Sequence, residues 1–408
     1  MFGRGAPLAT ASLLIGVLLA NDSFSVSNAF VVVAPSSSFA STSTMHSSSA
    51  LGATEVATAT ALEELSKMTT ISIDSGDLDV VEKYASTGLV TDATTNPLFV
   101  SQAGASGDKR YQDMVTEAIT YAKQQLGGGD SPMADFEPEI NLAMDKLAVS
   151  LGAKLTTLVP GKVSTEVDIR LSYDIDASVE RARRIIKMYE EVGVDKSRIL
   201  IKLAGTWEGI QAAKILEKEG IHCNITLIFS FLQAAAAAQA HAYLVSPFPG
   251  RILDWYKSKG ANAADDGNFH PTADPGVLLI KRIYSYFKKY GYKTICMPSS
   301  WRPSRGAAVD GSDVDEIVAL AGVDEMTIPP NLLESLMVLD GDSLSRQCDP
   351  ETSAACCIDP DYKLDEETFK AYFDSDGCGK DKLNEGIESF TKNTIELREV
   401  LYNKFAEG

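Results

Sequence analysis

The stretch RILIKLAGTWEG, residues 198–209, places a lysine inside a run that otherwise has the composition of a buried strand. Short aliphatic runs of this kind are typical of parallel strands that are covered on both faces. Lys202 has two interpretations. Its side chain extends the ammonium group to water from a strand end, or it is a desolvated amine that attacks a carbonyl carbon. The rest of the chain decides between them.

Eight short apolar runs, including this one, are separated by segments with helical periodicity. We predict strands over residues 69–74, 89–97, 161–168, 198–203, 223–229, 242–248, 294–300 and 325–330. Helices are expected between them, for example over 177–192, after Thr206, and after the cap and first-turn proline at Asp274 and Pro275. Strands alternating with helices predict parallel βα units, and eight units predict a single α/β (β/α)8 TIM barrel. An open doubly wound sheet is the alternative, but its phosphate-binding glycine fingerprint is absent after the first strands.

Residues 1–54 differ from the rest of the chain in composition. Residues 1–29 contain a short uncharged apolar stretch after Arg4, which is typical of a signal peptide. Residues 30–54 are rich in Ser, Thr and Ala and have no acidic residue, which is typical of a transit peptide. Together they resemble the bipartite presequences of algae with secondary plastids, and they predict a plastid (chloroplast) stroma location, with simple secretion as the alternative. The barrel domain is then expected over 55–408.

The chain is acidic, with 56 Asp and Glu residues against 37 Lys and Arg residues and a net charge of −19. This balance argues against nucleic acid and anionic membrane surfaces as partners. No stretch after the presequence is long and apolar enough for a transmembrane helix, so no membrane contact is expected for the mature form. Six cysteines are too few for a disulfide scaffold in a chain of this length.

Polar side chains stand at the predicted carboxyl ends of seven strands. They are Asp74, Asn96, Glu166, Lys202, Asn224 with Thr226, Ser246 with Arg251, and Arg302. One such residue by itself is usually structural. In a (β/α)8 barrel, however, these strand ends meet at one mouth, where the active sites of this fold lie. We therefore predict that the polar residues share one site.

The residue types fit a reaction that needs neither a cofactor nor a metal ion. A neutral Lys202 that attacks a ketone forms a carbinolamine, which must lose water. This step calls for a nearby acid and an ordered water, held by groups such as Glu166 and Thr226. The protonated Schiff base then accepts electrons, so a base such as Asp74, acting on a neighbouring hydroxyl, allows a carbon–carbon bond to break.

The remaining polar residues suit a phosphorylated sugar. Asn96, Asn224 and Ser246 can hydrogen-bond the hydroxyl groups of a sugar chain. Arg251 and Arg302 can hold a phosphate in the bidentate manner that a lysine cannot. Sugar phosphates are therefore the expected partners.

Six stretches together resemble one enzyme family, the transaldolases, and the resemblance covers nearly all of residues 60–408. The stretches are DATTNP (92–97), VSTEVDIRLSYD (163–174), RILIKLAGTWEGI (198–210), CNITLIFSF (223–231), SPFPGRILDWYK (246–257) and KDKLNEGIESF (380–390). The resemblance implies a circularly permuted class I aldolase barrel with an extra C-terminal helix. It also implies transfer of a dihydroxyacetone unit from a ketose phosphate to an aldose phosphate, in the pentose phosphate pathway.

The resemblance also implies a role for each candidate residue. The Schiff-base lysine corresponds to Lys202, the acid/base aspartate to Asp74, and the groups that hold a water to Glu166 and Thr226. The implied substrate contacts are Asn96, Asn224, Ser246, Phe248, Arg251 and Arg302. Related enzymes that cleave fructose 6-phosphate without transfer tend to have a tyrosine at the position of Phe248, so this residue favours transfer over a fructose-6-phosphate aldolase-like lyase. The oligomeric state stays open, and a homodimer is one alternative.

Three segments depart from the family pattern or invite a second interpretation. Residues 297–303, MPSSWRP, stand where the family usually has GASFRN, and their two prolines put the role of Arg302 in doubt. Residues 345–380 hold Cys348, Cys356, Cys357 and Cys378, for which inert thiols are favoured over a redox pair. Residues 374–385 mimic a calcium loop, and coincidence is favoured over a non-catalytic, calcium-responsive barrel.

Overall fold

The computed structural model describes residues 58–126, 136–260 and 268–407 of the chain. The predicted presequence segments, 1–29 and 30–54, and the domain boundary at residue 55 lie outside the described residues. Within the described ranges, no helix combines the length and the apolar character that crossing a membrane requires.

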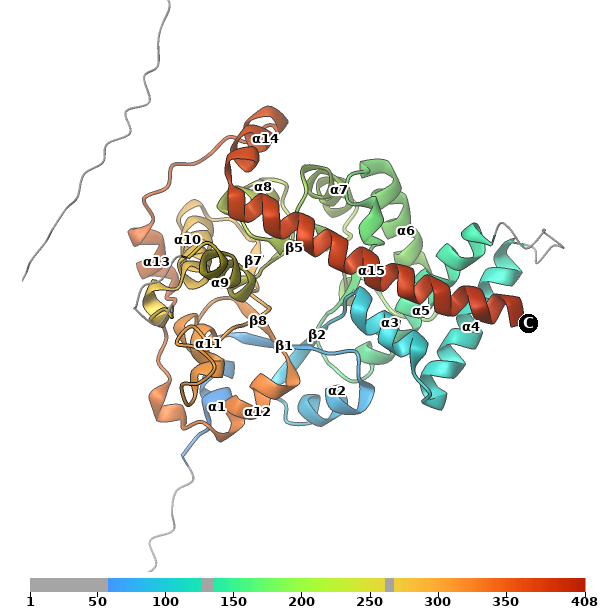
Figure 1. Ribbon diagram of the computed structural model, residues 1–408, viewed down its shortest axis with the longest axis horizontal. Coiled ribbons are helices and arrows are strands. Elements are labelled where there is room, and N and C mark those ends of the chain that lie inside the picture. Colours follow the sequence, from blue (N-terminus) through green and yellow to red (C-terminus); the bar gives the residue numbers. More distant parts are fainter. Residues whose placement is uncertain (1–57, 127–135, 261–267, 408) are drawn as a thin grey trace, which may run out of the picture. The chain divides into compact units, whose positions relative to one another are not determined.

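The described residues contain one eight-stranded parallel sheet, which confirms the predicted strands and the barrel class (Figure 1). Its strands are β1 (Thr70–Asp74), β2 (Val90–Thr94), β3 (Val163–Glu166), β4 (Ile199–Ala204), β5 (Cys223–Ile228), β6 (Leu244–Pro247), β7 (Ile295–Cys296) and β8 (Glu325–Ile328). They follow one another around the sheet in chain order, and β8 pairs with β1. The barrel is nearly closed, because the main-chain N–H of Thr327 donates to the carbonyl of Pro298, just after β7, at 3.2 Å.

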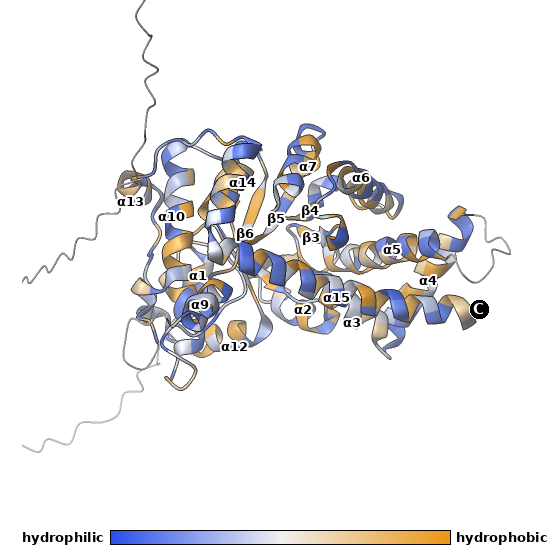
Figure 2. Cartoon of the chain, turned by 45° about the horizontal axis from the view of Figure 1, so that its top comes forward, coloured by the Kyte–Doolittle hydropathy of each residue, from blue (hydrophilic) through white to orange (hydrophobic). Residues whose placement is uncertain are grey.

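Helices surround the strands. They are α1 (Ala61–Ser66), α2 (Leu78–Ala85), α3 (Pro97–Ala105), α4 (Lys109–Leu126), α5 (Glu137–Thr156), α6 (Ile175–Glu191), α7 (Trp207–Lys218), α8 (Phe231–Gln239), α9 (Pro249–Ser258), α10 (Pro275–Tyr290), α11 (Asp315–Ala319), α12 (Pro330–Val338), α13 (Pro350–Cys356), α14 (Glu366–Ser375) and α15 (Gly377–Glu407). Helices such as α6 and α10 have a hydrophobic side and a hydrophilic side (Figure 2), as expected where one face packs on a sheet.

Two predicted helix starts are confirmed by their caps. The Thr206 hydroxyl accepts a hydrogen bond from the N–H of Gly209 at 2.9 Å. The Asp274 carboxylate accepts from the N–H of Gly276 at 2.8 Å, with Pro275 in the first turn of α10. These side chains satisfy N–H groups that have no partner within the helix.

The long last helix, α15, runs across the carboxyl ends of the strands (Figure 1). It packs closely there, because a Cβ atom at Gly386 would lie 2.8 Å from the Leu227 side chain. The calcium-loop-like segment 374–385 is mostly part of this helix, since α15 begins at Gly377. A helix cannot wrap its side chains around one ion as a calcium loop does.

Candidate active site

Lys202 points into the barrel. Its side chain is 7% exposed, and its Nζ donates to the Thr95 carbonyl at 3.2 Å and lies 3.4 Å from Oε2 of Glu166. An ammonium group that extended to bulk water would be exposed and would not have these two buried neighbours. The structure therefore supports the interpretation of Lys202 as a desolvated amine.

Glu166 ends β3 directly beside Lys202 in the sheet register. Its side chain is 3% exposed, and neither carboxyl oxygen has a hydrogen bond from a described residue. Burial raises the pKa of Glu166 to about 7, although the neighbouring Lys202 opposes this shift. A carboxyl group with this pKa can both donate and accept a proton near neutral pH.

Thr226 lies on β5, the strand on the other side of Lys202. Its hydroxyl is buried and has no hydrogen-bond partner among the described residues. A buried polar atom without a partner is costly and rare in a folded protein. Glu166 and Thr226 therefore leave hydrogen-bonding capacity on both sides of the lysine for a water molecule or a substrate.

Asp74 ends β1 and is partly buried. Burial raises its pKa, while the charge of Lys202 and a hydrogen bond from Thr94 act in the opposite direction. The Thr94 hydroxyl lies 2.9 Å from Oδ1 of Asp74 and 2.8 Å from the hydroxyl of Thr327. This pair of threonines fixes the carboxyl group at the barrel mouth, where the sequence predicts a base.

Asn224 and Ser246 form part of a hydrogen-bonded row across three strands. The Ser246 hydroxyl donates to Oδ1 of Asn224 at 2.8 Å, and Nδ2 of Asn224 donates to the Ser164 hydroxyl at 3.1 Å. Because both Asn224 and Ser246 are buried, these bonds set the orientation of the amide.

A pocket of about 230 Å³ lies at the mouth. The predicted residues that line it are Asp74, Asn96, Lys202, Ser246, Phe248 and Arg251. Glu166, Asn224 and Thr226 are buried and lie outside this lining, as does Arg302. Asn96 also caps α3, since its side chain accepts from the N–H of Phe99 at 3.2 Å.

The two predicted phosphate arginines differ in their surroundings. Arg251 lies over the rings of Phe248 and Phe390, with its Cζ 5.2 Å and 5.9 Å from the ring centroids, and forms no ion pair with a described residue. Arg302 is paired instead, with its Nε 3.1 Å from Oδ2 of Asp254. The structure thus places Arg251 in the pocket wall and Arg302 just outside it.

Sequence reasoning missed part of the lining. The missed polar residues are Thr94, Ser299, Ser300, Thr327, Ser389 and Asn393. The first four lie on or just after predicted strands, whose carboxyl ends meet at the mouth of the barrel. Their position in the sequence could therefore have identified them. Ser389 and Asn393 belong to α15, and no local pattern says that this helix crosses the mouth.

Comparison with known proteins agrees with this geometry. The family model described as transaldolase/fructose-6-phosphate aldolase matches residues 71–401. A transaldolase of Thermosynechococcus vestitus is 44% identical over 345 residues, which cover 85% of this chain and 82% of that protein. A probable transaldolase of Dictyostelium discoideum is 44% identical over 337 residues, which cover 83% of this chain and 97% of that protein.

The chain belongs to the transaldolase family. A further member, a transaldolase of Nostoc sp., is 44% identical over 346 residues, with 85% of this chain and 96% of that protein covered. The match extends through β1 to β8 and most of α15, so every element that places a candidate residue lies inside it.

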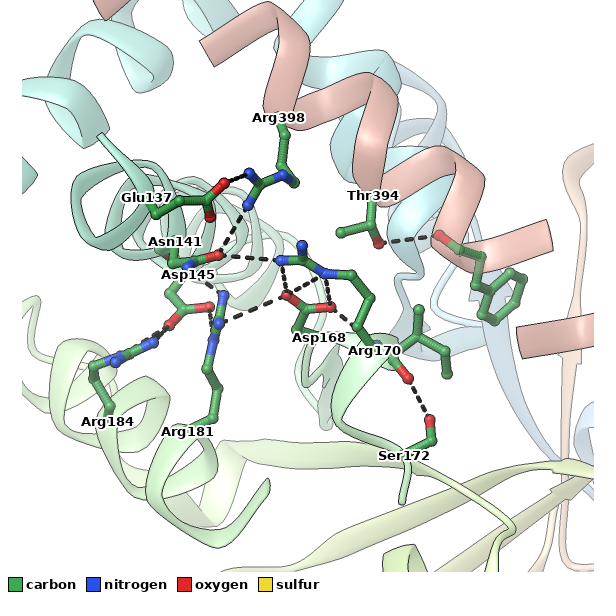
Figure 3. Close-up of polar contacts among 12 residues, drawn as sticks. Glu137, Asn141, Asp145, Asp168, Arg170, Ser172, Arg181, Arg184, Thr394 and Arg398 are labelled. Atoms are coloured by element: carbon green, nitrogen blue, oxygen red, sulfur yellow. Dashed lines mark hydrogen bonds and ion pairs between the residues drawn. The ribbon is translucent and has the colours of Figure 1, made fainter. Parts of the chain in front are cut away.

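Around Asp168, in the loop that follows β3, this transaldolase-family chain contains a network of charged side chains (Figure 3). Asp145 on α5 accepts from Arg181 at 2.7 Å and from Arg184, and Asp168 accepts from Arg170. Burial opposes ionisation of Asp168, but the charges of Arg170 and Arg181 outweigh it and lower its pKa. The network fixes the loop that follows β3, and with it the end of the strand that presents Glu166.

The four cysteines of residues 345–380 do not share one environment. Cys348 and Cys378 are buried, and burial raises their pKa to about 11 and about 12, whereas Cys356 is exposed. Burial of this kind makes thiolate formation unfavourable at the first two. Within the described ranges, no group of three or more His, Cys, Asp or Glu side chains is arranged to hold a metal ion.

Proposed function

We propose that the chain is a transaldolase that forms a Schiff base with its substrate. It transfers a dihydroxyacetone unit from sedoheptulose 7-phosphate or fructose 6-phosphate to glyceraldehyde 3-phosphate or erythrose 4-phosphate, a reaction of the non-oxidative pentose phosphate pathway. The observation that supports this most directly is the buried Lys202, 3.4 Å from Glu166 in a pocket that also exposes Asp74. Its relatives are named for the same activity.

The first half of the reaction uses Lys202 and Glu166. The Lys202 amine attacks the ketone carbon of the donor, and the carbonyl oxygen takes up a proton to give a carbinolamine. Glu166, with its pKa near 7, gives a proton to the departing hydroxyl, and water leaves as the iminium forms. The unpartnered hydroxyl of Thr226 provides a hydrogen bond for this water.

The second half uses Asp74. Its carboxylate takes the proton of the hydroxyl group on the second carbon from the iminium carbon. The bond between that carbon and the carbon next to the iminium carbon then breaks. The electrons of this bond enter the iminium and give an enamine, while an aldose phosphate leaves. The enamine then attacks the aldehyde of the acceptor, Asp74 returns the proton to the new oxygen, and water releases the product ketose from Lys202.

Covalent trapping tests this proposal. Borohydride treatment in the presence of fructose 6-phosphate should add the mass of a reduced triose to the peptide that contains Lys202. Lys202→Met should remove both the adduct and turnover, while circular dichroism shows that the fold is kept. A folded, substrate-exposed protein that gives no adduct would exclude the mechanism.

The alternative within the family is a fructose-6-phosphate aldolase-like lyase. The ring of Phe248 lies in the pocket wall beside Arg251, where a tyrosine would bring a hydroxyl group that can activate water. We therefore favour transfer. Product analysis of fructose 6-phosphate with and without erythrose 4-phosphate separates the two activities, because only a lyase releases free dihydroxyacetone at a comparable rate in both reactions.

We also propose a plastid location, which depends on the composition of residues 1–54 alone. Fusion of these residues to a fluorescent protein, expressed in an alga with a secondary plastid, should direct the fluorescence to the plastid stroma. Fluorescence in the medium would support secretion instead. Fusion of residues 30–54 alone should fail to enter the secretory route.

A further inference from the structure

The ion pair between Arg302 and Asp254 joins two elements beside the pocket. Asp254 lies on α9, one turn after Arg251, and its Oδ2 is 3.1 Å from Nε of Arg302. Arg302 uses a second donor within its own loop, since Nη1 donates to the Trp301 carbonyl at 2.9 Å. Its Nη2 group has no hydrogen bond to a described residue and is left for an external acceptor.

Asp254 also offsets a repulsion between two guanidinium groups. Burial lowers the pKa of Arg251, and the nearby charge of Arg302 lowers it further, while the charges of Glu385, Asp254 and Asp74 act against both effects. Arg251 has ring contacts but no carboxylate partner within the described ranges. Without Asp254, repulsion between the two guanidinium groups would favour an Arg302 side chain that turns away from Arg251 into water.

The main chain of Arg302 is held independently of this ion pair. Its N–H donates to Oε2 of the fully buried Glu316 at 2.7 Å, and the Trp301 indole donates to the Thr327 carbonyl at 2.8 Å. The loop therefore stays in place when the Asp254 carboxylate is removed. What Asp254 fixes is the direction of the Arg302 side chain, which is 41% exposed.

We infer that Asp254 is a positioning residue for phosphate recognition: it holds Arg302 beside Arg251 so that both guanidinium groups face one phosphate. The inference rests on the proposed function for the identity of the substrate. Bidentate hydrogen bonds to one phosphate depend on the plane of each guanidinium group, so both arginines must be oriented correctly. An arginine that rotates freely must be ordered when the substrate binds, and this ordering lowers the affinity.

Kinetics with Asp254→Ala test the inference. We expect KM for fructose 6-phosphate to rise about ten-fold and kcat to change by less than about two-fold. This is the pattern for loss of one charge-assisted contact that is equally strong in the ground state and in the transition state. Asp254→Glu should restore most of the affinity. With unphosphorylated fructose, kcat/KM should be the same in the wild type and in Asp254→Ala. Asp381→Ala is the matched control, since Asp381 contacts Trp255 of the same helix and Lys259 just after it, and does not contact Arg302.

A titration with inorganic phosphate, followed by calorimetry, gives a readout that does not need turnover. Binding should weaken in Asp254→Ala and stay unchanged in Asp381→Ala. Unchanged or tighter phosphate binding in Asp254→Ala, or an equal loss of kcat/KM for fructose, would overturn the inference. Failure of the proposed function would appear elsewhere, as a wild-type protein that binds phosphate but forms no borohydride-trapped adduct on Lys202.

Discussion

Nζ of Lys202 lies 3.4 Å from Oε2 of Glu166, and both side chains are almost completely buried. Burying two ionisable groups costs more than a single contact of this length returns, so the pair is not a source of stability. Burial raises the pKa of Glu166 to about 7 in spite of the lysine. The pair is therefore suited to passing protons during imine formation and hydrolysis.

The raised pKa of Glu166 predicts a pH-dependent cost to stability. Between about pH 4.5 and pH 7, the folded chain keeps a proton on Glu166 that the unfolded chain has lost, so the free energy of unfolding falls as pH rises through this window. Glu166→Gln does not titrate. As pH rises from 4.5 to 8, the free energy of unfolding of this variant, measured in urea, should therefore increase by up to about 3 kcal/mol relative to that of the wild type.

The control for this measurement is Glu388→Gln, because Glu388 is exposed on α15. Its difference from the wild type gives the effect of the same substitution at an exposed site. A constant difference for Glu166→Gln would mean that Glu166 ionises in the folded state as it does in water. Turnover of Glu166→Gln should fall by about 10²- to 10⁴-fold, the usual contribution of a general acid or base.

Thr226→Val should separate activity from stability. The hydroxyl of Thr226 is buried without a hydrogen bond to a described residue, so a methyl group in its place should leave the free energy of unfolding unchanged or higher. Loss of the hydrogen bond to water should lower kcat by about ten-fold. Thermal unfolding and steady-state kinetics give the two numbers.

Thr165→Val supplies the opposite case. Thr165 is equally buried, but its hydroxyl is hydrogen-bonded to the Tyr189 hydroxyl at 2.5 Å. Its replacement leaves the phenol without a partner and should cost about 1–3 kcal/mol of stability with little effect on kcat. If Thr226→Val lost stability in the same way, a structural role for its hydroxyl would replace the catalytic one.

The strands and their polar ends were predictable because each depends on local signals. An aliphatic run interrupted by Lys202 or ended by Glu166 identifies both the strand and its functional residue. The rule that parallel strands present their carboxyl ends at one mouth then brings the residues together. No measurement of distance is needed for this step, which explains why the pocket contains six of the predicted side chains.

Contacts between elements far apart in the chain were not predictable. Nothing in the periodicity of α15 shows that Ser389 and Asn393 reach the pocket, because an amphipathic helix packs equally well on the outside of a barrel. The pairing of Arg302 with Asp254 joins residues 48 positions apart and depends on the path of a loop. The proline-containing segment 297–303 keeps that loop at the mouth, with Ser299 and Ser300 in the pocket wall.

Asp145→Ala should be among the most destabilising single changes outside the pocket. The carboxylate accepts hydrogen bonds from Arg181, whose side chain is 8% exposed, and from Arg184 (Figure 3). Its loss leaves the Arg181 charge buried without its closest partner, at a cost of about 3–5 kcal/mol in urea unfolding. Because the network fixes the loop after β3, kcat should fall as well.

Two further variants make the Asp145 result interpretable. Asp113→Ala removes an exposed carboxylate that pairs with Lys109 and should cost less than about 1 kcal/mol. Asp145→Leu combined with Arg181→Met removes both buried charges and should recover much of the lost stability. If Asp145→Ala were as stable as the wild type, Asp168 alone would be enough to neutralise Arg181, since the two side chains lie 3.6 Å apart.

Gly250→Ala should disturb the phosphate side of the pocket through the main chain. Gly250 lies in the first turn of α9, where an added Cβ would come within 2.4 Å of the Ser300 carbonyl oxygen and 2.6 Å of Cγ of Arg302. Alanine normally stabilises a helix relative to glycine by about 1 kcal/mol. In Gly250→Ala, by contrast, the loop that contains Ser300 and Arg302 must move. We therefore expect lower thermal stability and a several-fold higher KM for fructose 6-phosphate.

Gly107→Ala is the control, because there is open space around its Cβ position, and it should change neither quantity. If Gly250→Ala behaved in the same way, the loop would accommodate the methyl group without moving Arg302.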